Sequence, residues 1–247
     1  MHRLFTDVLI IRGNITMTKR ILLAAAAALA ALAPALAITP AASAATGTIS
    51  NGIAWTAKPD AGPSNPMKNQ EYCTLGVVGT DALGNKIAIS AGHCVSAAAG
   101  GATEFPDGAT VYRFGSSGTG DPIGKVAYRD PVIDYVVIEL NADAVLSSQG
   151  PDARIDSIGP ASPEGTLCKA GVRTGLTCGT IYGQTSPRIN SFTPANGGDS
   201  GGPAFVNDTQ LVGMTRGPFE FIDIGAVLGS IDAQPNPVGK GFAVTND

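Results

Sequence analysis

Histidine is almost absent from this 247-residue chain, which contains only His2 and His93. Cysteine is scarce as well: there are four, and none form the C-x-x-C spacing that is common in zinc sites. We therefore expect no zinc site. The chain has no run of lysine or arginine beyond Lys19-Arg20, and its formal net charge is −4. Such a charge pattern argues against nucleic acid or an anionic membrane surface as a partner.

Helical patterns are also scarce: no segment after the N-terminal region keeps a long apolar repeat of 3.6 residues. Short apolar runs such as "TLGVVGT", "KIAISAG", "DYVVIEL" and "LVGMT" alternate instead with turn sequences such as "FPDG" and "SSGTG". This spacing predicts an all-β sandwich or barrel. Residues 142–165 are poor in strand signals and are predicted to link two β units, while Asn207-Asp208 is predicted to be a hairpin tip.

The N-terminal region holds the one long apolar run, "ILLAAAAALAALAPALA", which follows two basic residues and precedes small residues. These are the parts of an export signal, with cleavage favoured at Ala42–Ala44 and Ala35–Ala37 as the second choice. Met17 is a plausible natural start. A membrane anchor is the alternative, but the run is at the short end for spanning and contains Pro34. We expect a secreted protein that loses residues 1–44 and keeps no stable membrane anchor.

The four cysteines lie beyond this signal, and an even number in an exported chain predicts two disulfides. Four cysteines allow three connectivities. We favour the local pairing, Cys73–Cys94 and Cys168–Cys178.

The stretch "NGGDSGGP" places four glycines around one Asp-Ser pair. A mobile surface loop is the plain interpretation. The alternative is chemical: without a Cβ at Gly198, the backbone can turn so that the N–H groups of Gly198 and Ser200 converge on one point. A nucleophilic serine needs such donors for the oxyanion that forms, and it needs a base to take its proton.

His93 and Asp134 are the candidate partners of this serine. His93 ends the apolar run "AISAGHC" beside Cys94, and Asp134 directly precedes "YVVIEL". Taken singly, a histidine is more often structural and an acid at a strand start is usually solvated. A buried carboxylate at a strand end is, however, also what fixes the orientation of a catalytic imidazole.

In this order, "AISAGHC", "DYVVIEL" and "GGDSGGP" resemble the His, Asp and Ser motifs of the chymotrypsin-like serine endopeptidases. The stretch "CKAGVRTGLTCGTI" resembles a segment of the bacterial branch, the streptogrisin and α-lytic protease type. The resemblance covers roughly Cys73 to Gly217. It implies two antiparallel six-stranded β-barrels with a cleft between them, residues 45–145 forming the first and residues 146–247 the second.

The resemblance also implies a role for each candidate. His93 is the general base and then the acid, Asp134 orients it, and Ser200 attacks the scissile carbonyl. The N–H groups of Gly198 and Ser200 form the oxyanion hole. The implied function is a secreted, monomeric serine endopeptidase that acts on protein or peptide substrates without a metal or organic cofactor.

Two further features follow from the resemblance alone. Asp199 is expected to be buried in a structural ion pair with Lys169, with Arg173 as the alternative partner. The substrate pocket is expected to be lined by two segments, which contribute Pro194, Ala195, Asn196, Gly197, Thr215, Arg216 and Gly217.

The expected substrate preference depends on Pro194 and Arg216. Pro194 stands where some relatives carry the acid that selects Lys or Arg, so an apolar or small side chain is predicted, with an acidic one as runner-up. Arg216 has three possible orientations: toward the pocket, toward Asp134 or into solvent. For a lone arginine the solvent orientation is favoured.

The departures from the family pattern motivate a rival function. The segment between Cys178 and Ser200 is short, and Arg216-Gly217-Pro218 replaces the usual Ser-Gly-Gly. A secreted domain that binds peptides with little turnover is therefore the main alternative. A secreted esterase is a third interpretation, but "GDSGG" does not fit the G-x-S-x-G elbow of that class.

Overall fold

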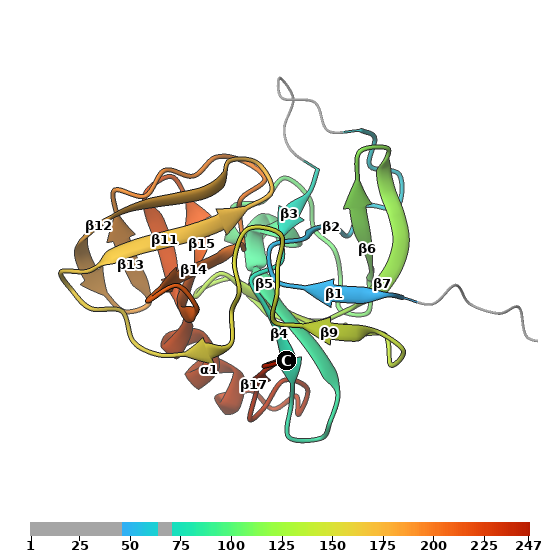
Figure 1. The fold of residues 1–247 in the computed structure, drawn as a ribbon. Coiled ribbons are helices and arrows are strands. Elements are labelled where there is room, and N and C mark those ends of the chain that lie inside the picture. Colours follow the sequence, from blue (N-terminus) through green and yellow to red (C-terminus); the bar gives the residue numbers. More distant parts are fainter. Residues whose placement is uncertain (1–45, 64–70) are drawn as a thin grey trace, which may run out of the picture. The chain divides into compact units, whose positions relative to one another are not determined.

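The computed structural model describes residues 46–63 and 71–247, so the predicted export signal lies outside the described residues. The described residues form three β-sheets and one α-helix. Figure 1 shows how these elements are arranged. The predicted all-β class is confirmed. No helix within the described ranges is long and apolar enough to cross a membrane.

The first large sheet contains eight strands, all paired antiparallel. It curls like half a barrel, and its two edge strands have only two residues each. In spatial order the strands are β17 (Ala243–Val244), β4 (Val77–Thr80), β5 (Lys86–Ala91), β8 (Tyr135–Leu140), β7 (Gly118–Asp130), β6 (Thr110–Gly115), β2 (Ala54–Thr56) and β3 (Cys73–Thr74).

The second large sheet closes into a six-stranded barrel because β15 pairs with both β14 and β16. A seventh strand, β10, adds to β15 in parallel. The strands are β10 (Ser157–Ile158), β15 (Gln210–Gly217), β14 (Pro203–Val206), β11 (Thr166–Gly171), β12 (Gly175–Thr185), β13 (Arg188–Ser191) and β16 (Glu220–Asp223).

The predicted double barrel is thus present, with closure by hydrogen bonds in its second half. The first sheet stays open at β3, whose Thr74 N–H donates to the carbonyl of Ser200 in the second barrel at 2.9 Å. A small third sheet pairs β1 (Thr48–Ser50) with β9 (Val145–Ser147) in parallel. The predicted linker, residues 142–165, therefore contains the short strands β9 and β10.

The helix α1 (Ile224–Ala233) was not expected from the sequence. Its N-cap is Asp223, whose carboxylate accepts hydrogen bonds from the N–H groups of Gly225 and Ala226 at 2.7 and 3.2 Å. Its buried side chains, Ile224, Val227 and Ile231, have helical spacing, but glycines interrupt the pattern between them. The predicted hairpin tip is confirmed, because Asn207 and Asp208 both have positive φ between β14 and β15.

One hydrophobic cluster joins the two large sheets. It contains Ile89 and Val137 from β5 and β8, Phe205 and Met214 from β14 and β15, and Ile231 from α1. All five are buried. Because interiors are close-packed, this shared core fixes the two sheets relative to each other, and with them any site built from both.

Candidate functional site

His93 lies in a short 3₁₀ helix, η1 (Gly92–Cys94), directly after β5. Its ring Nδ1 is 2.9 Å from Oδ2 of Asp134 and 3.2 Å from Oδ1. The backbone N–H of His93 also donates to Asp134 Oδ1, at 2.7 Å. One carboxylate therefore holds both the ring and the backbone of His93. Within the described residues the other ring nitrogen, Nε2, has no hydrogen-bond partner, and an imidazole held in this way can act as a base through Nε2.

Asp134 is held just before β8 in a left-handed backbone conformation, with φ of 77°. Only 1% of its surface is exposed. Its N–H donates to the carbonyl of Asp130 at 2.9 Å, and its carbonyl accepts from the N–H of Gly92 at 3.0 Å. Aspartate tolerates this conformation better than most residues, and the surrounding hydrogen bonds keep it there.

The loop that carries Ser200 has the expected glycine at its turn. Gly198 has φ of 102°, and a Cβ there would lie 2.8 Å from the ring of Tyr72, so a side chain would be both strained and crowded. The carbonyl of Gly198 accepts from Thr74 Oγ1 at 2.7 Å. Within residues 46–63 and 71–247, the N–H groups of Gly198 and Ser200 donate no hydrogen bond, which is what an oxyanion hole requires before substrate binds.

Asp199 is fully buried and forms an ion pair with Lys169 at 3.3 Å. Its carboxylate also accepts from the N–H groups of Arg173, Thr174 and Asn196 at 2.9 to 3.0 Å. Burial lowers the pKa of the Lys169 ammonium below its usual range, and the charge of Asp199 opposes that shift. The expected partner is thus Lys169, while Arg173 contributes its backbone N–H and not its guanidinium.

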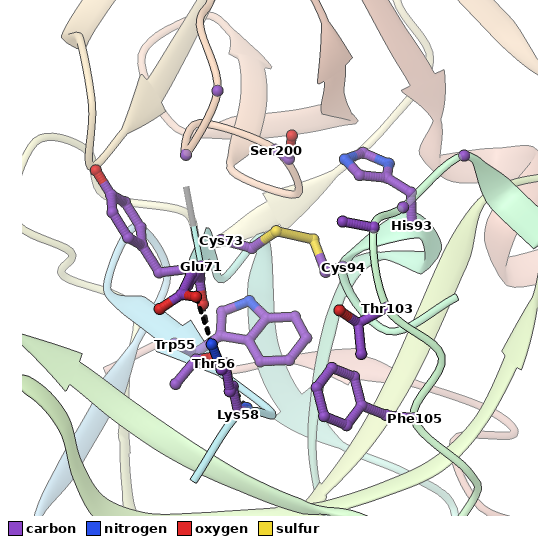
Figure 2. Close-up of a pocket in the computed structure, with 16 residues that line it drawn as sticks. Trp55, Thr56, Lys58, Glu71, Cys73, His93, Cys94, Thr103, Phe105 and Ser200 are labelled. Atoms are coloured by element: carbon purple, nitrogen blue, oxygen red, sulfur yellow. Dashed lines mark hydrogen bonds and ion pairs between the residues drawn. A yellow bond between two sulfur atoms is a disulfide. The ribbon is translucent and has the colours of Figure 1, made fainter. Parts of the chain in front are cut away.

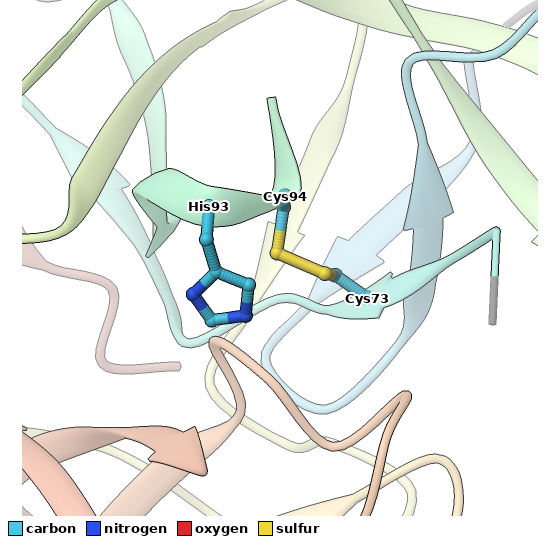
Figure 3. Close-up of side chains that lie close together, drawn as sticks. All are labelled: Cys73, His93 and Cys94. Atoms are coloured by element: carbon cyan, nitrogen blue, oxygen red, sulfur yellow. A yellow bond between two sulfur atoms is a disulfide. The ribbon is translucent and has the colours of Figure 1, made fainter. Parts of the chain in front are cut away.

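Both expected disulfides are present, Cys73–Cys94 and Cys168–Cys178. Figure 3 shows the first of them next to the ring of His93. The donor atoms of Cys73, His93 and Cys94 lie within 4.8 Å of one another, a grouping found in metal sites. The two sulfurs are bonded to each other, however, so neither is a thiolate that could bind a metal.

A pocket of about 510 Å³ opens beside His93 and Ser200, both of which line it. Figure 2 shows these two side chains near the Cys73–Cys94 disulfide, with Trp55, Phe105 and Lys58 farther along. Lys58 forms an ion pair with Glu71, which also lines the pocket. The other lining residues are Thr56, Tyr72, Gly100, Gly101, Ala102, Thr103, Gly197 and Gly198.

This pocket is not the one expected from the sequence. Of the seven residues expected to line a substrate pocket, Gly197 alone lines this one. Trp55, Tyr72 and Phe105 were not predicted from the sequence, because they come from separate segments. One signal was available: Trp55 is the only tryptophan of the chain and follows the small-residue N-terminal region.

Arg216 points toward Asp134, so the favoured expectation of a solvent orientation was wrong. Its Nε is 3.1 Å from Asp134 Oδ2, and its Nη1 is 3.1 Å from Glu220 Oε2. The pairing of β15 with β16 has a register shift between Thr215 and Gly217. An irregularity of this kind re-aims a side chain, and here it falls at Arg216.

We predict that removing the Cys73–Cys94 disulfide costs more than removing Cys168–Cys178. The closed loops span 21 and 10 residues, and loop entropy gives about 3 kcal/mol for the longer one and slightly less for the shorter. Denaturant unfolding of the two double Cys→Ser variants measures this. A loss of stability in the Cys168–Cys178 variant that equals or exceeds the loss in the Cys73–Cys94 variant would contradict this prediction.

Comparison with known proteins finds relatives of this chain in Mycobacterium tuberculosis. The Mycobacterium tuberculosis proteins Rv1815 (strain ATCC 25618 / H37Rv) and MT1863 (strain CDC 1551 / Oshkosh), both named as uncharacterized proteins, are 34% identical over 160 residues. That match covers 60% of this chain and 68% of each relative. No family model matches the chain.

Solved structures resemble the fold. Protease A of Thermobifida fusca aligns with a TM-score of 0.56 at 20% identity, over 81% of this chain and 100% of its own. The Nocardiopsis protease NAPase aligns with a TM-score of 0.54 at 23% identity, over 74% of this chain and 96% of its own. Cellulomonas bogoriensis chymotrypsin aligns with a TM-score of 0.54 at 21% identity, over 81% of this chain and 100% of its own. The chain therefore has the fold of the bacterial chymotrypsin-like serine proteases.

Proposed function

This chain belongs to the same family as the mycobacterial proteins Rv1815 and MT1863 and has the chymotrypsin-like fold, and we propose that it is a secreted serine endopeptidase. The observation that carries the proposal is the Asp134–His93 pair beside a pocket that Ser200 also lines. A carboxylate, an imidazole and a hydroxyl in this order are the parts of a nucleophilic triad.

In the proposed reaction, His93 takes the proton of Ser200 as Oγ bonds to the carbonyl carbon of the substrate. The resulting oxyanion is bound by the N–H groups of Gly198 and Ser200. His93 then gives its proton to the leaving amine, the C–N bond breaks, and an acyl ester remains on Ser200. Water, deprotonated by His93, attacks this ester and releases the acid. Asp134 stays ionised and stabilises the imidazolium throughout.

The proposed location is extracellular, and the substrate class is proteins or peptides. Two disulfides in a chain of this size are typical of an oxidising compartment. The apolar N-terminal run, which fits an export signal, agrees with secretion.

The proposed function is tested by labelling the protein with a fluorophosphonate probe and by profiling a peptide library. Rapid labelling requires an activated serine and a formed oxyanion hole. The alternative function, a peptide-binding domain with little turnover, is supported by Arg216, whose charge competes with His93 for Asp134. Peptide binding without labelling would favour that rival, and labelling with cleavage would favour the endopeptidase.

We further propose that the 510 Å³ pocket receives the side chain that follows the scissile bond. It is lined by the disulfide and by the aromatic residues Trp55, Tyr72 and Phe105, surfaces that suit an apolar side chain. An acyl-enzyme should therefore transfer its acyl group to leucinamide in preference to glycinamide.

We predict that Phe105→Ala reduces this preference several-fold, since part of the apolar contact is lost. The ratio of aminolysis to hydrolysis products, measured with both amides, reports the effect. Phe192→Ala is the matched control, because Phe192 is exposed, stacks on Tyr182 and does not line the pocket. An unchanged ratio in Phe105→Ala, or an equal change in the control, would assign this side chain to another place.

A further inference from the structure

Arg216 and His93 share one oxygen of Asp134. The Oδ2 atom lies 2.9 Å from His93 Nδ1 and 3.1 Å from Arg216 Nε. Nε is buried and, among the described residues, lacks a hydrogen bond of acceptable geometry, although its distance is that of an ion pair. The contact between Arg216 and Asp134 is therefore one of charge more than of hydrogen bonding.

A second set of contacts holds Arg216 in this place. Glu220 on β16 binds Arg216 Nη1 through Oε2 at 3.1 Å and Arg188 Nε through Oε1 at 2.9 Å. Arg188 on β13 in turn donates from Nη1 to the carbonyl of Ile133, the residue before Asp134, at 2.9 Å. Two arginines of the second barrel thus contact the loop that carries Asp134, and Glu220 links them to each other.

The other charged groups near this loop are engaged elsewhere. Asp130 accepts from the N–H groups of Val132 and Ile133 and, at 3.2 Å, from Ser230 Oγ on α1. On the side of His93, the cysteines are in a disulfide and do not titrate. Among the described residues, Asp134 has two side-chain partners in ion-pair geometry: the guanidinium of Arg216, and the imidazole of His93, which is charged only when it is protonated.

The contact between Arg216 and Asp134 changes how strongly that carboxylate stabilises a protonated His93. A lone buried carboxylate favours the protonated imidazole, and a cation on the same carboxylate offsets that effect. Arg188, Glu220, Arg216 and Asp134 together carry equal numbers of positive and negative charges. His93 therefore faces a group that is close to neutral, where a lone Asp134 would present a full negative charge.

We propose that Arg216 is a positioning residue that keeps His93 neutral, and so able to act as a base, to lower pH than Asp134 alone would allow. The catalytic part of this statement rests on the proposed function; the effect on protonation does not. The same offset weakens the support of the imidazolium that forms as Ser200 attacks. Arg216 should therefore favour activity in acid and lower the maximal rate in alkali.

The protonation effect is measured directly by NMR. The full chain contains two histidines, so a His2→Gln background leaves His93 as the single imidazole signal. In Arg216→Gln we expect the midpoint of its titration to move up by about one pH unit. The shift should be modest, because Arg216 contacts Asp134 and not His93 itself, and its side chain is 34% exposed. Arg216→Lys should restore most of the original midpoint.

Two control variants test whether something other than the charge of Arg216 moves the titration midpoint of His93. Arg216→Ser is a second neutral variant, in case Arg216→Gln does not fold. Arg113→Gln removes one positive charge from a half-buried side chain on β6, whose guanidinium binds the carbonyl of Thr48, and it should leave the midpoint unchanged. A midpoint that does not move in the neutral variants, or that moves equally in Arg113→Gln, overturns the proposal.

Labelling rates separate this inference from the proposed function. Fluorophosphonate labelling between pH 5 and pH 9 should give crossing profiles, with Arg216→Gln slower in acid and faster in alkali than the parent chain. A parent chain that never labels, together with a shifted midpoint, would refute the endopeptidase and keep the role of Arg216. A uniform loss at every pH with an unshifted midpoint would show that Arg216 is merely structural.

Discussion

Peptide-bond hydrolysis should be abolished in Ser200→Ala, with kcat/KM lowered by about 10⁴-fold or more. The substitution removes the one atom that would form the acyl bond, while the amides of Gly198 and Ser200 and the pocket remain. In triad enzymes the residual rate then comes from substrate binding and the oxyanion hole alone. Fluorophosphonate labelling should disappear in the same variant, because no other residue would carry the adduct.

The control for this experiment is Ser147→Ala. Ser147 lies on β9, and its hydroxyl accepts from the N–H of Gln149 at 3.2 Å, outside the candidate site. This variant should keep the parent rate and the parent labelling. Hydrolysis that survives undiminished in Ser200→Ala, with the same melting temperature, would mean that another group carries the reaction.

The parts of the site that are local in sequence could be predicted from it. His93 and Asp134 each lie at the end of an apolar run, so their positions at strand ends follow from the pattern, and the glycines around Ser200 indicate its turn. The disulfide pairing was likewise predictable, because local pairing joins neighbouring segments. The alternating apolar runs predicted the sheets for the same reason: a strand pattern repeats every two residues.

The features that depend on packing between distant segments could not be predicted in this way. The pocket is built from residues near 55, 72, 100 and 198, and nothing local in any of them indicates the others. The orientation of Arg216 depends on a register shift between β15 and β16, which reverses the face a side chain takes. The helix α1 was not predicted, because Gly225 and Gly229 weaken its helical pattern.

The second large effect is expected at Lys169, where replacement by alanine should destabilise the fold by about 3–5 kcal/mol. Lys169 and Asp199 are both fully buried, so neither can exchange its partner for water. Removing the ammonium leaves a buried carboxylate without its cation. The Lys169 Nζ also donates to Thr174 Oγ1 and to the carbonyl of Gly175, and these acceptors would lose their partner too.

Two further variants separate charge from packing in this prediction. Lys169→Met keeps most of the side-chain volume, so a loss that it shares with Lys169→Ala measures the stranded carboxylate and not a cavity. Lys125→Ala is the matched ion-pair control. Lys125 pairs with Glu139 at 3.2 Å but is 56% exposed, and its loss should cost less than about 1 kcal/mol. Denaturant unfolding of the three variants gives the comparison.

Fluorophosphonate labelling should slow together with the loss of stability in the Lys169 variants, because Asp199 links the ion pair to the loop that carries Gly198 and Ser200. Its carboxylate accepts from the N–H of Asn196, and its backbone lies between Gly198 and Ser200, whose amides form the proposed oxyanion hole. A carboxylate without its cation would draw in water or shift, and the amides would move with it. Labelling of Lys169→Met should therefore be slower than that of the parent chain at a temperature where both are folded. If unfolding and labelling both match the parent, the ion pair is dispensable and the backbone donors of Arg173 and Thr174 are sufficient to hold Asp199.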